Sequence, residues 1–212
     1  MAFLTKLDQV AERLRERIIS GEYMRGDKLK QAEIAAELGV SVTPVREALK
    51  VLEMEGFIVS VPHKGLSVPD IEPERAGEIY KLRVMLERSL TEQAVARITR
   101  EQIAELRAMQ REMAALIKAG EVYPVRAANV RFHFRVYEIA DCPQTLQFVR
   151  VLWAKYPFNF HDDQSVRFKQ LLREHGEFVR RLEAGDRPGA VEAMVDHIQT
   201  GWSRVSRNVL PA

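Results

Sequence analysis

Apolar residues recur at helical spacing along most of this chain. Near the N-terminus, Val10, Leu14 and Ile18 share one side of a predicted helix, which we expect to end at Gly21 because glycine favours the backbone conformation that closes a helix. After residue 75, breaks rich in Gly, Pro and Asp separate further helical segments, and strand-like alternation is lacking. These predicted helices span about 75–98, 99–119, 124–140, 143–156, 163–184 and 188–208. The C-terminal part is therefore predicted to be an all-α bundle of roughly six helices.

The first two bundle helices carry further local signals. In the first, one apolar stripe is predicted from Ile79, Leu82, Leu86 and Leu90. Thr99 is expected to cap the second helix, and Gln102 lies three residues later, as a capping box requires. Gly120 is expected to end it.

A different pattern occupies residues 31–57, where two short helices flank a tight turn. Gly39 follows the first helix at the position where a positive φ is needed. Thr43 is predicted to cap the second helix, with Pro44 at its first position, where a missing N–H costs nothing. Arg46 and Lys50 lie one turn apart, away from the apolar face. An ordinary helical hairpin would fit, but this arrangement is typical of a helix-turn-helix that enters the DNA major groove.

The segment that follows favours the DNA-binding interpretation. Gly56 is expected to end the second helix, and residues 57–61 are β-branched and strand-like. Turn chemistry at 62–65 separates them from a return strand at 66–68. Together they predict a β-hairpin wing with His63 and Lys64 at its tip.

The sequence LGVSVTPVREALKVLEMEGF resembles the winged-helix domain of GntR-type bacterial transcription regulators, and the resemblance covers about residues 5–70. In that family the second helix enters the major groove and the wing contacts the neighbouring minor groove. Val42 stands where the family usually has Arg, so we expect modest affinity and an altered operator, with an apolar contact from Val42 to a thymine methyl. The DNA contacts implied by position are Ser41, Thr43, Pro44 and Arg46 in the helix and His63, Lys64 and Gly65 in the wing.

The charge of the predicted DNA-binding domain is close to zero, because residues 1–70 hold 10 basic and 11 acidic side chains. Any basic patch is therefore local: we expect Arg46, Lys50 and Lys64 to form it, with Lys28 and Lys30 as further candidates. A near-neutral domain of this kind needs two half-sites for specific binding. We therefore predict a homodimer on a palindromic, double-stranded DNA operator.

Length and composition fit two domains without a membrane or disulfide component. Pro69 and Pro73 mark the break, giving a DNA-binding domain at 1–70, a linker at 71–74 and the bundle at 75–212. The single cysteine, Cys142, excludes an internal disulfide and a thiolate metal cluster. No signal-peptide run or membrane-length apolar segment occurs, so a soluble, cytoplasmic protein without a membrane partner is expected.

Histidines of the bundle form a second constellation. Asn129 and His133 are four residues apart and share one helix face, while His175 and His197 lie on two further helices. Each histidine taken singly is more often a surface or hydrogen-bonded residue than a ligand. Neutral imidazoles that converge from several helices are, however, the way helical bundles build metal sites.

Residues from about 75 to 212 resemble the FCD effector-binding domain of the FadR branch of GntR regulators, and the six-helix length resembles its VanR type. The matching segments are NVRFH and EHGEFVRRLEAGDRPGAVEAMVDHI. Family metal sites use an Asp and a His one turn apart and two later His. The resemblance implies a divalent metal on Asn129, His133, His175 and His197. Because Asn129 replaces the usual Asp with a neutral amide, we expect lower affinity and a preference for zinc or nickel.

Arg83, in the segment YKLRVMLE, matches a family arginine that pairs with an anionic effector. Its alternative role is a helix-surface ion pair with Glu87 at i+4. Together these features predict a homodimeric transcription regulator that responds to a metabolite. The predicted effector is a small carboxylate that binds at the metal, and because most regulators of this family are repressors, repression is expected. Two alternatives remain: a metal-dependent enzyme in the bundle, and an architectural DNA binder whose bundle only dimerises.

Overall fold

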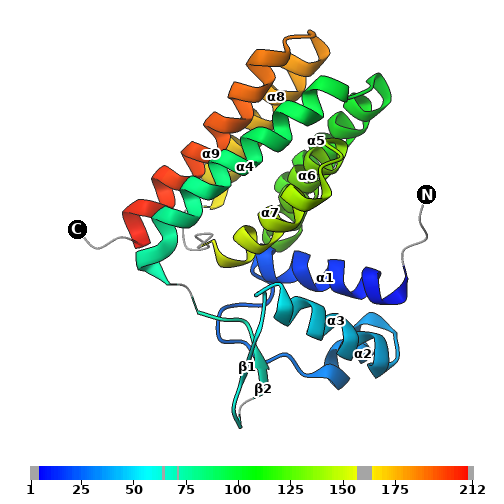
Figure 1. Ribbon diagram of the computed structural model, residues 1–212. Coiled ribbons are helices and arrows are strands. Elements are labelled where there is room, and N and C mark those ends of the chain that lie inside the picture. Colours follow the sequence, from blue (N-terminus) through cyan, green and yellow to red (C-terminus); the bar gives the residue numbers. More distant parts are fainter. Residues whose placement is uncertain (1–4, 64, 71, 157–163, 210–212) are drawn as a thin grey trace. The chain divides into compact units, whose positions relative to one another are not determined.

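Helices dominate the structure, a computed structural model that describes residues 5–63, 65–70, 72–156 and 164–209. In this described part, nine α-helices, one short 3-10 helix and one β-hairpin are divided between two compact units, Met1–Ile71 and Glu72–Ala212 (Figure 1). The mainly α prediction, with a winged helix followed by a helical bundle, is confirmed. None of the described helices is long and apolar enough to cross a bilayer.

The first unit contains α1 (Lys6–Ser20), α2 (Gln31–Leu38) and α3 (Val42–Met54), followed by β1 (Val59–Val61) and β2 (Gly65–Ser67). A capping box between Thr5 and Asp8 begins α1, and Gly21 ends it with φ 78°, as predicted. Both α1 and α2 pack against α3. Their apolar faces form a core that includes Leu14, Ile34, Val45, Leu49 and Leu52.

The turn between α2 and α3 contains one confirmed and one wrong prediction. Gly39 ends α2 with φ 64°, in the left-handed region expected for it. The cap of α3, however, is Ser41 and not Thr43. Ser41 is extended, and the helix begins directly after it, so Thr43 and Pro44 are its second and third residues. Pro44 is tolerated there because the first-turn N–H groups have no partner within the helix.

The wing is shorter than its β-branched sequence suggested. Its antiparallel register pairs Val59 with Ser67 and Val61 with Gly65. Phe57 and Ile58, predicted as strand, are fully buried and anchor the hairpin to the core. His63 has a positive φ of 62° in the turn, and Lys64 lies outside the described residues.

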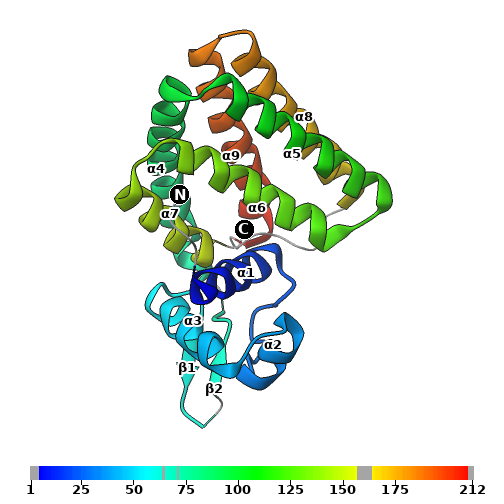
Figure 2. The ribbon, with the colours of Figure 1, turned by 90° about the vertical axis from the view of Figure 1, so that its right-hand side faces the viewer.

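In the second unit a short 3-10 helix (Pro73–Arg75) leads into six helices, which confirms the predicted number for the part of the bundle that is described. Figure 2 shows α5 and α8 side by side, and α9 packs against both α4 and α8. The capping box of Thr99 and Gln102 begins α5, and Gly120 ends it. The bounds are α4 (Ala76–Arg97), α5 (Arg100–Ala119), α6 (Val122–Ile139), α7 (Pro143–Lys155), α8 (Gln164–Glu183) and α9 (Arg187–Val209).

Helix α4 does not bury the stripe predicted for it. Leu90 is buried, but Leu82 is 39% exposed. The inward face instead carries Arg83, Glu87 and Thr91, which are all buried. Polar side chains occupy this face because they hydrogen-bond to one another and to groups on α6 and α7, so burial costs them no unpaired donor or acceptor.

Candidate functional site

The first unit presents the N-terminal half of α3 as an exposed surface. Ser41, Thr43, Arg46 and Lys50 are exposed and Pro44 is half-buried, while the opposite face of the helix lies in the core. Val42, at the first helical position, is 43% exposed. A helix held by its apolar face and open along its first two turns has the form needed to enter a DNA groove.

Both cations on this surface contact the same acidic residue. Arg46 Nε lies 3.5 Å and Lys50 Nζ 3.2 Å from Glu47 Oε1. Exposed ion pairs of this kind contribute little free energy, so a DNA phosphate can replace the carboxylate at small cost. His63 and Gly65 are exposed at the tip of the hairpin.

In the second unit three histidines converge from three helices. His133 comes from α6, His175 from α8 and His197 from α9, and all three are buried. One ring nitrogen from each lies within 4.8 Å of the others. The Nε2 atoms of His133 and His197 are 3.0 Å apart.

Hydrogen bonds to the outer nitrogens fix the protonation of two of these rings. Glu174 Oε2 lies 2.7 Å from Nδ1 of His197, and because a carboxylate only accepts, the proton is on that Nδ1. On the other side Tyr137 donates its hydroxyl proton to Glu87. The tyrosine oxygen therefore accepts from Nδ1 of His133, 3.1 Å away.

Neutral rings in these tautomers direct two lone pairs at each other across the 3.0 Å between the Nε2 atoms. Burial, and then the neighbouring imidazole of His197, hold the pKa of His133 well below its ordinary value. Burial also lowers the pKa of His175 and of His197. Facing lone pairs repel unless a cation lies between or beside them, so the arrangement suits a metal ion.

Two polar side chains of the predicted metal site lack hydrogen bonds within the described part of the chain. Asn129, one turn before His133 on α6, has a buried Oδ1 to which none of the described residues donates. The same holds for both ring nitrogens of His175. Buried polar atoms are almost always paired, and unpaired ones commonly mark an ion or a ligand. The predicted donor set of three imidazoles and one amide therefore fits a divalent metal ion.

Arg83 is enclosed beside the histidines. Its Nε lies 2.6 Å from Glu87 Oε1, and its guanidinium carbon lies 4.6 Å and 4.2 Å from the ring centroids of Trp153 and Tyr156. The alternative predicted for Arg83, an ion pair with Glu87, is present, but it is buried and not on the helix surface. Trp153 donates to the same Glu87 oxygen at 3.0 Å. Because Nε and Nη2 of Arg83 donate to Glu87, an anionic ligand would compete with Glu87 for these donors.

A cavity of about 280 Å³ between α8 and α9 opens next to this site. Glu174 and His197 both line it, together with Glu177, Arg180 and Asp196. The hydrogen-bonded pair of Glu174 and His197 therefore forms the edge of the histidine cluster that an ion or small molecule reaches from this cavity.

Sequence reasoning missed the groups that surround the histidines. Tyr137 lies four residues after His133 and Glu174 directly before His175, so their nearness was visible in the sequence. Their function was not visible, because a tyrosine or glutamate beside a histidine has many ordinary positions. Only the packing of α4, α6, α8 and α9 shows which ring each one contacts.

Comparison with known proteins agrees with both units. Residues 6–68 match the model described as bacterial regulatory proteins, gntR family, and residues 78–200 match the FCD domain. The Nta operon transcriptional regulator of Aminobacter aminovorans is 32% identical over 191 residues, covering 88% of each chain. The gluconate operon transcriptional repressor of Bacillus subtilis (strain 168) is 31% identical over 197 residues, covering 88% of this chain and 79% of the repressor.

Among solved structures, E. coli McbR/YncC has a TM-score of 0.83 at 21% identity, covering 97% of this chain and 99% of that one. This likeness concerns the fold, whereas the family models and the relatives above concern descent. The chain therefore belongs to the gntR family of bacterial regulatory proteins, carries an FCD domain in its second unit, and is a transcription regulator and not an enzyme.

Proposed function

We propose that this regulator binds a palindromic operator as a cytoplasmic homodimer and represses transcription until a small carboxylate effector binds at a metal ion in its FCD domain. The observation that carries the proposal is the buried cluster of His133, His175 and His197, in which none of the described residues hydrogen-bonds to the ring nitrogens of His175. A regulator with such a cluster has a site at which a ligand can act on DNA affinity.

The DNA side of the proposal rests on α3 and the wing. Ser41, Thr43, Pro44, Arg46 and Lys50 would contact the major groove, and His63, Lys64 and Gly65 the adjacent minor groove. Because one first unit offers few cations, two copies on two half-sites give the affinity that one lacks. Repression is supported by the relative from Bacillus subtilis, which is named a transcriptional repressor.

The metal side rests on donor chemistry. FCD domains often bind metal, and here Asn129, His133, His175 and His197 would be the ligands. Imidazole nitrogens bind zinc and nickel better than they bind hard cations such as magnesium. A neutral amide in place of a carboxylate strengthens that preference. When bound, the ion would supply open coordination positions, and we propose that an effector carboxylate occupies one of them.

Arg83 is the proposed second contact of that carboxylate. We propose that the effector competes with Glu87 for the donors of Arg83, so binding would loosen the contact of α4 with Tyr137 on α6. A ligand that changes this contact has unequal affinity for the two states of the bundle, which is the requirement for control of DNA binding. The word gluconate in the name of one relative denotes a carboxylate and agrees with this chemical class.

The first experiment is the metal content of protein purified without a histidine tag, measured by elemental mass spectrometry, with His175→Ala as the control. We expect close to one zinc or nickel per chain in the wild type and its loss in the variant. Wild-type protein that stays metal-free after incubation with both ions would overturn the metal site.

The second experiment separates a regulator with an effector from an architectural DNA binder. An operator is selected from random DNA with the metal-loaded protein, and its affinity is then measured after chelation and with a panel of small carboxylates. We expect at least one of these treatments to change the affinity by about 5–150-fold, the usual range of allosteric coupling. Unchanged affinity throughout would favour the architectural alternative.

A further inference from the structure

Glu174 is an acidic residue that hydrogen-bonds directly to one of the clustered histidines. Among the described residues it is the only carboxylate hydrogen-bonded directly to a ring of the cluster, through Nδ1 of His197 at 2.7 Å. Its other oxygen accepts from Gln170 at 2.7 Å, and its side chain is 14% exposed. Because a carboxylate oxygen accepts the proton of Nδ1–H, the negative side chain of Glu174 lies directly against the ring of His197.

The Glu174 carboxylate is important because the proposed ligands themselves carry no negative charge. Three neutral imidazoles and Asn129 supply no negative charge to a divalent ion. Arg167, on α8, places a positive charge near all three histidines and also near Glu174. The carboxylate of Glu87, which reaches His133 through Tyr137, is already paired with Arg83. Glu174 accepts from the neutral amide of Gln170 and from His197, so its carboxylate is bonded to the cluster, and these two hydrogen bonds link it to no cation.

We propose that Glu174 is a positioning residue of the metal site: it orients His197 through Nδ1 and supplies the negative charge that Asn129 does not. The inference rests on the proposed metal site and explains how a ligand set without a carboxylate still binds a dication. A histidine that donates its outer N–H to a carboxylate becomes a stronger ligand, and its ring is held in the tautomer that leaves Nε2 open.

Glu174 also lines the cavity between α8 and α9. Glu174 and His197 line it together with Arg173 and Arg180, while His133 and His175 are not among its lining residues, so this pair is the part of the site that a hydrated cation in the cavity can contact. The carboxylate is therefore placed both to attract the ion and to hold the ligand that the ion can contact.

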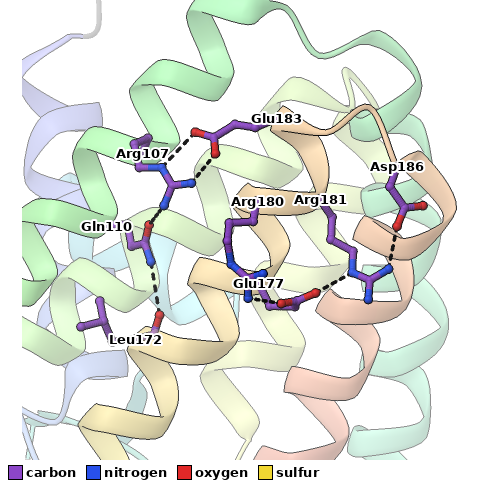
Figure 3. A network of polar contacts seen from close by, with 8 residues as sticks. All are labelled: Arg107, Gln110, Leu172, Glu177, Arg180, Arg181, Glu183 and Asp186. Atoms are coloured by element: carbon purple, nitrogen blue, oxygen red, sulfur yellow. Dashed lines mark hydrogen bonds and ion pairs between the residues drawn. The ribbon is translucent and has the colours of Figure 1, made fainter.

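Glu177 provides a matched control on the same helix. It lines the same cavity and lies one turn from Glu174, but Figure 3 shows its carboxylate directed to Arg180 and Arg181. The Nε of Arg181 lies 2.6 Å from Glu177 Oε1. Loss of the Glu177 charge changes the field in the cavity without removing a bond to an imidazole.

The test uses cobalt(II) as the probe metal with metal-free, full-length protein. The dissociation constant is measured by competition with a chelator, and the visible ligand-field spectrum of the bound ion reports its coordination. We expect Glu174→Gln to weaken binding by about 10–100-fold and to change the spectrum, as loss of an outer-sphere carboxylate commonly does. Glu177→Gln is expected to stay within about twofold of the wild type, because it leaves every bond to the cluster in place.

A rescue experiment separates charge and positioning from general damage. Asn129→Asp adds a carboxylate among the ligands themselves, so the double variant Asn129→Asp/Glu174→Gln is expected to regain most of the lost affinity. Thermal melting of the metal-free variants checks that they fold. If Glu174→Gln does not fold, Glu174→Asp, which keeps the charge but stops one methylene short of His197, is measured instead and is expected to bind about tenfold more weakly.

Two outcomes are distinct. Wild-type affinity in the folded Glu174 variant, with an unchanged cobalt spectrum, overturns the role of Glu174 and leaves the metal site standing. Absence of cobalt, zinc and nickel binding by the wild type overturns the metal site itself, and the inference with it.

Discussion

The pair of Arg83 and Glu87 shows how much one buried contact can hold together. Arg83 is enclosed between two aromatic rings, and the carboxylate of Glu87 also accepts from Trp153 on α7 and Tyr137 on α6. The charge of Arg83 is paired with that of Glu87, and both side chains are buried. Removing one partner therefore leaves an isolated charge in the interior, which is far costlier than losing an exposed ion pair.

We predict that Arg83→Met lowers the free energy of unfolding by about 3–5 kcal/mol, since it leaves the Glu87 carboxylate buried without its cation. Chemical denaturation of the metal-free protein measures the change. The double variant Arg83→Met/Glu87→Gln removes both charges and is expected to recover about 0.5–3 kcal/mol of the loss. Equal losses in the single and double variants would contradict this account.

Val42 is the residue at which this chain departs most clearly from the GntR pattern of the DNA-binding helix. Its side chain is exposed at the first position of α3, where an arginine would add one phosphate or base contact. We predict that Val42→Arg steepens the dependence of log Kd on log salt concentration by about one unit, because one more cation is placed on the DNA.

Binding to the selected operator at several salt concentrations measures that slope. Met54→Arg, at the other end of α3 and 80% exposed, is the control with the same added charge. A slope that steepens equally in both variants would mean that the added charge acts over the whole surface and that Val42 does not face the DNA.

At the level of the elements, the sequence predicted where helices begin and end more reliably than it predicted which helix face is buried. Gly21 correctly predicted the C-terminal end of α1, and Thr99 and Gly120 predicted both ends of α5, because cap conformations depend on local chemistry. The start of α3 was misplaced because Ser41 and Thr43 are both good caps and only the packed structure selects one. The inward face of α4 was missed because polar partners on other helices, and not its own apolar residues, determine it.

The turn that separates α2 from α3 gives a prediction for this scale. A Cβ at Gly39 would meet nothing within 4 Å, but φ is 64°, so Gly39→Ala should cost about 1–2 kcal/mol through backbone strain alone and weaken DNA binding. Gly77, near the start of α4, also has open space around it and no positive φ. Gly77→Ala is expected to stabilise its unit by about 0.5–1 kcal/mol. Thermal melting of both variants tests the opposite signs.

For the whole molecule, the division into two units means that the proposed metal site and the proposed DNA-binding surface belong to different parts of the chain. The proposed metal ligands all lie in the second unit and the proposed DNA contacts all lie in the first. The sequence predicted a residue list for each site, and the structure brings His133, His175 and His197 of the second list together. The packing of α4, α6, α8 and α9 around the histidines was not predictable, since it depends on contacts between residues far apart in the chain.

We predict that zinc at about one hundred times its Kd stabilises the second unit by about 2.7 kcal/mol and leaves the first unit unchanged. Differential scanning calorimetry with and without the ion measures both transitions, and His175→Ala serves as the control that should show no shift. A shift of equal size in His175→Ala would assign the effect to ions bound elsewhere on the protein.

The position of Trp153 gives the molecule an optical property of its own. The chain has two tryptophans, and the indole of Trp153 hydrogen-bonds to Glu87, stacks on Arg83 and lies 5.2 Å from the ring of His133. Any ion or effector that moves these groups changes the surroundings of this fluorophore. Trp202 stacks on Tyr80 at 4.6 Å and can be replaced by Phe to leave one emitter. The regulator thus carries a built-in reporter that follows occupancy of its buried site without an added label.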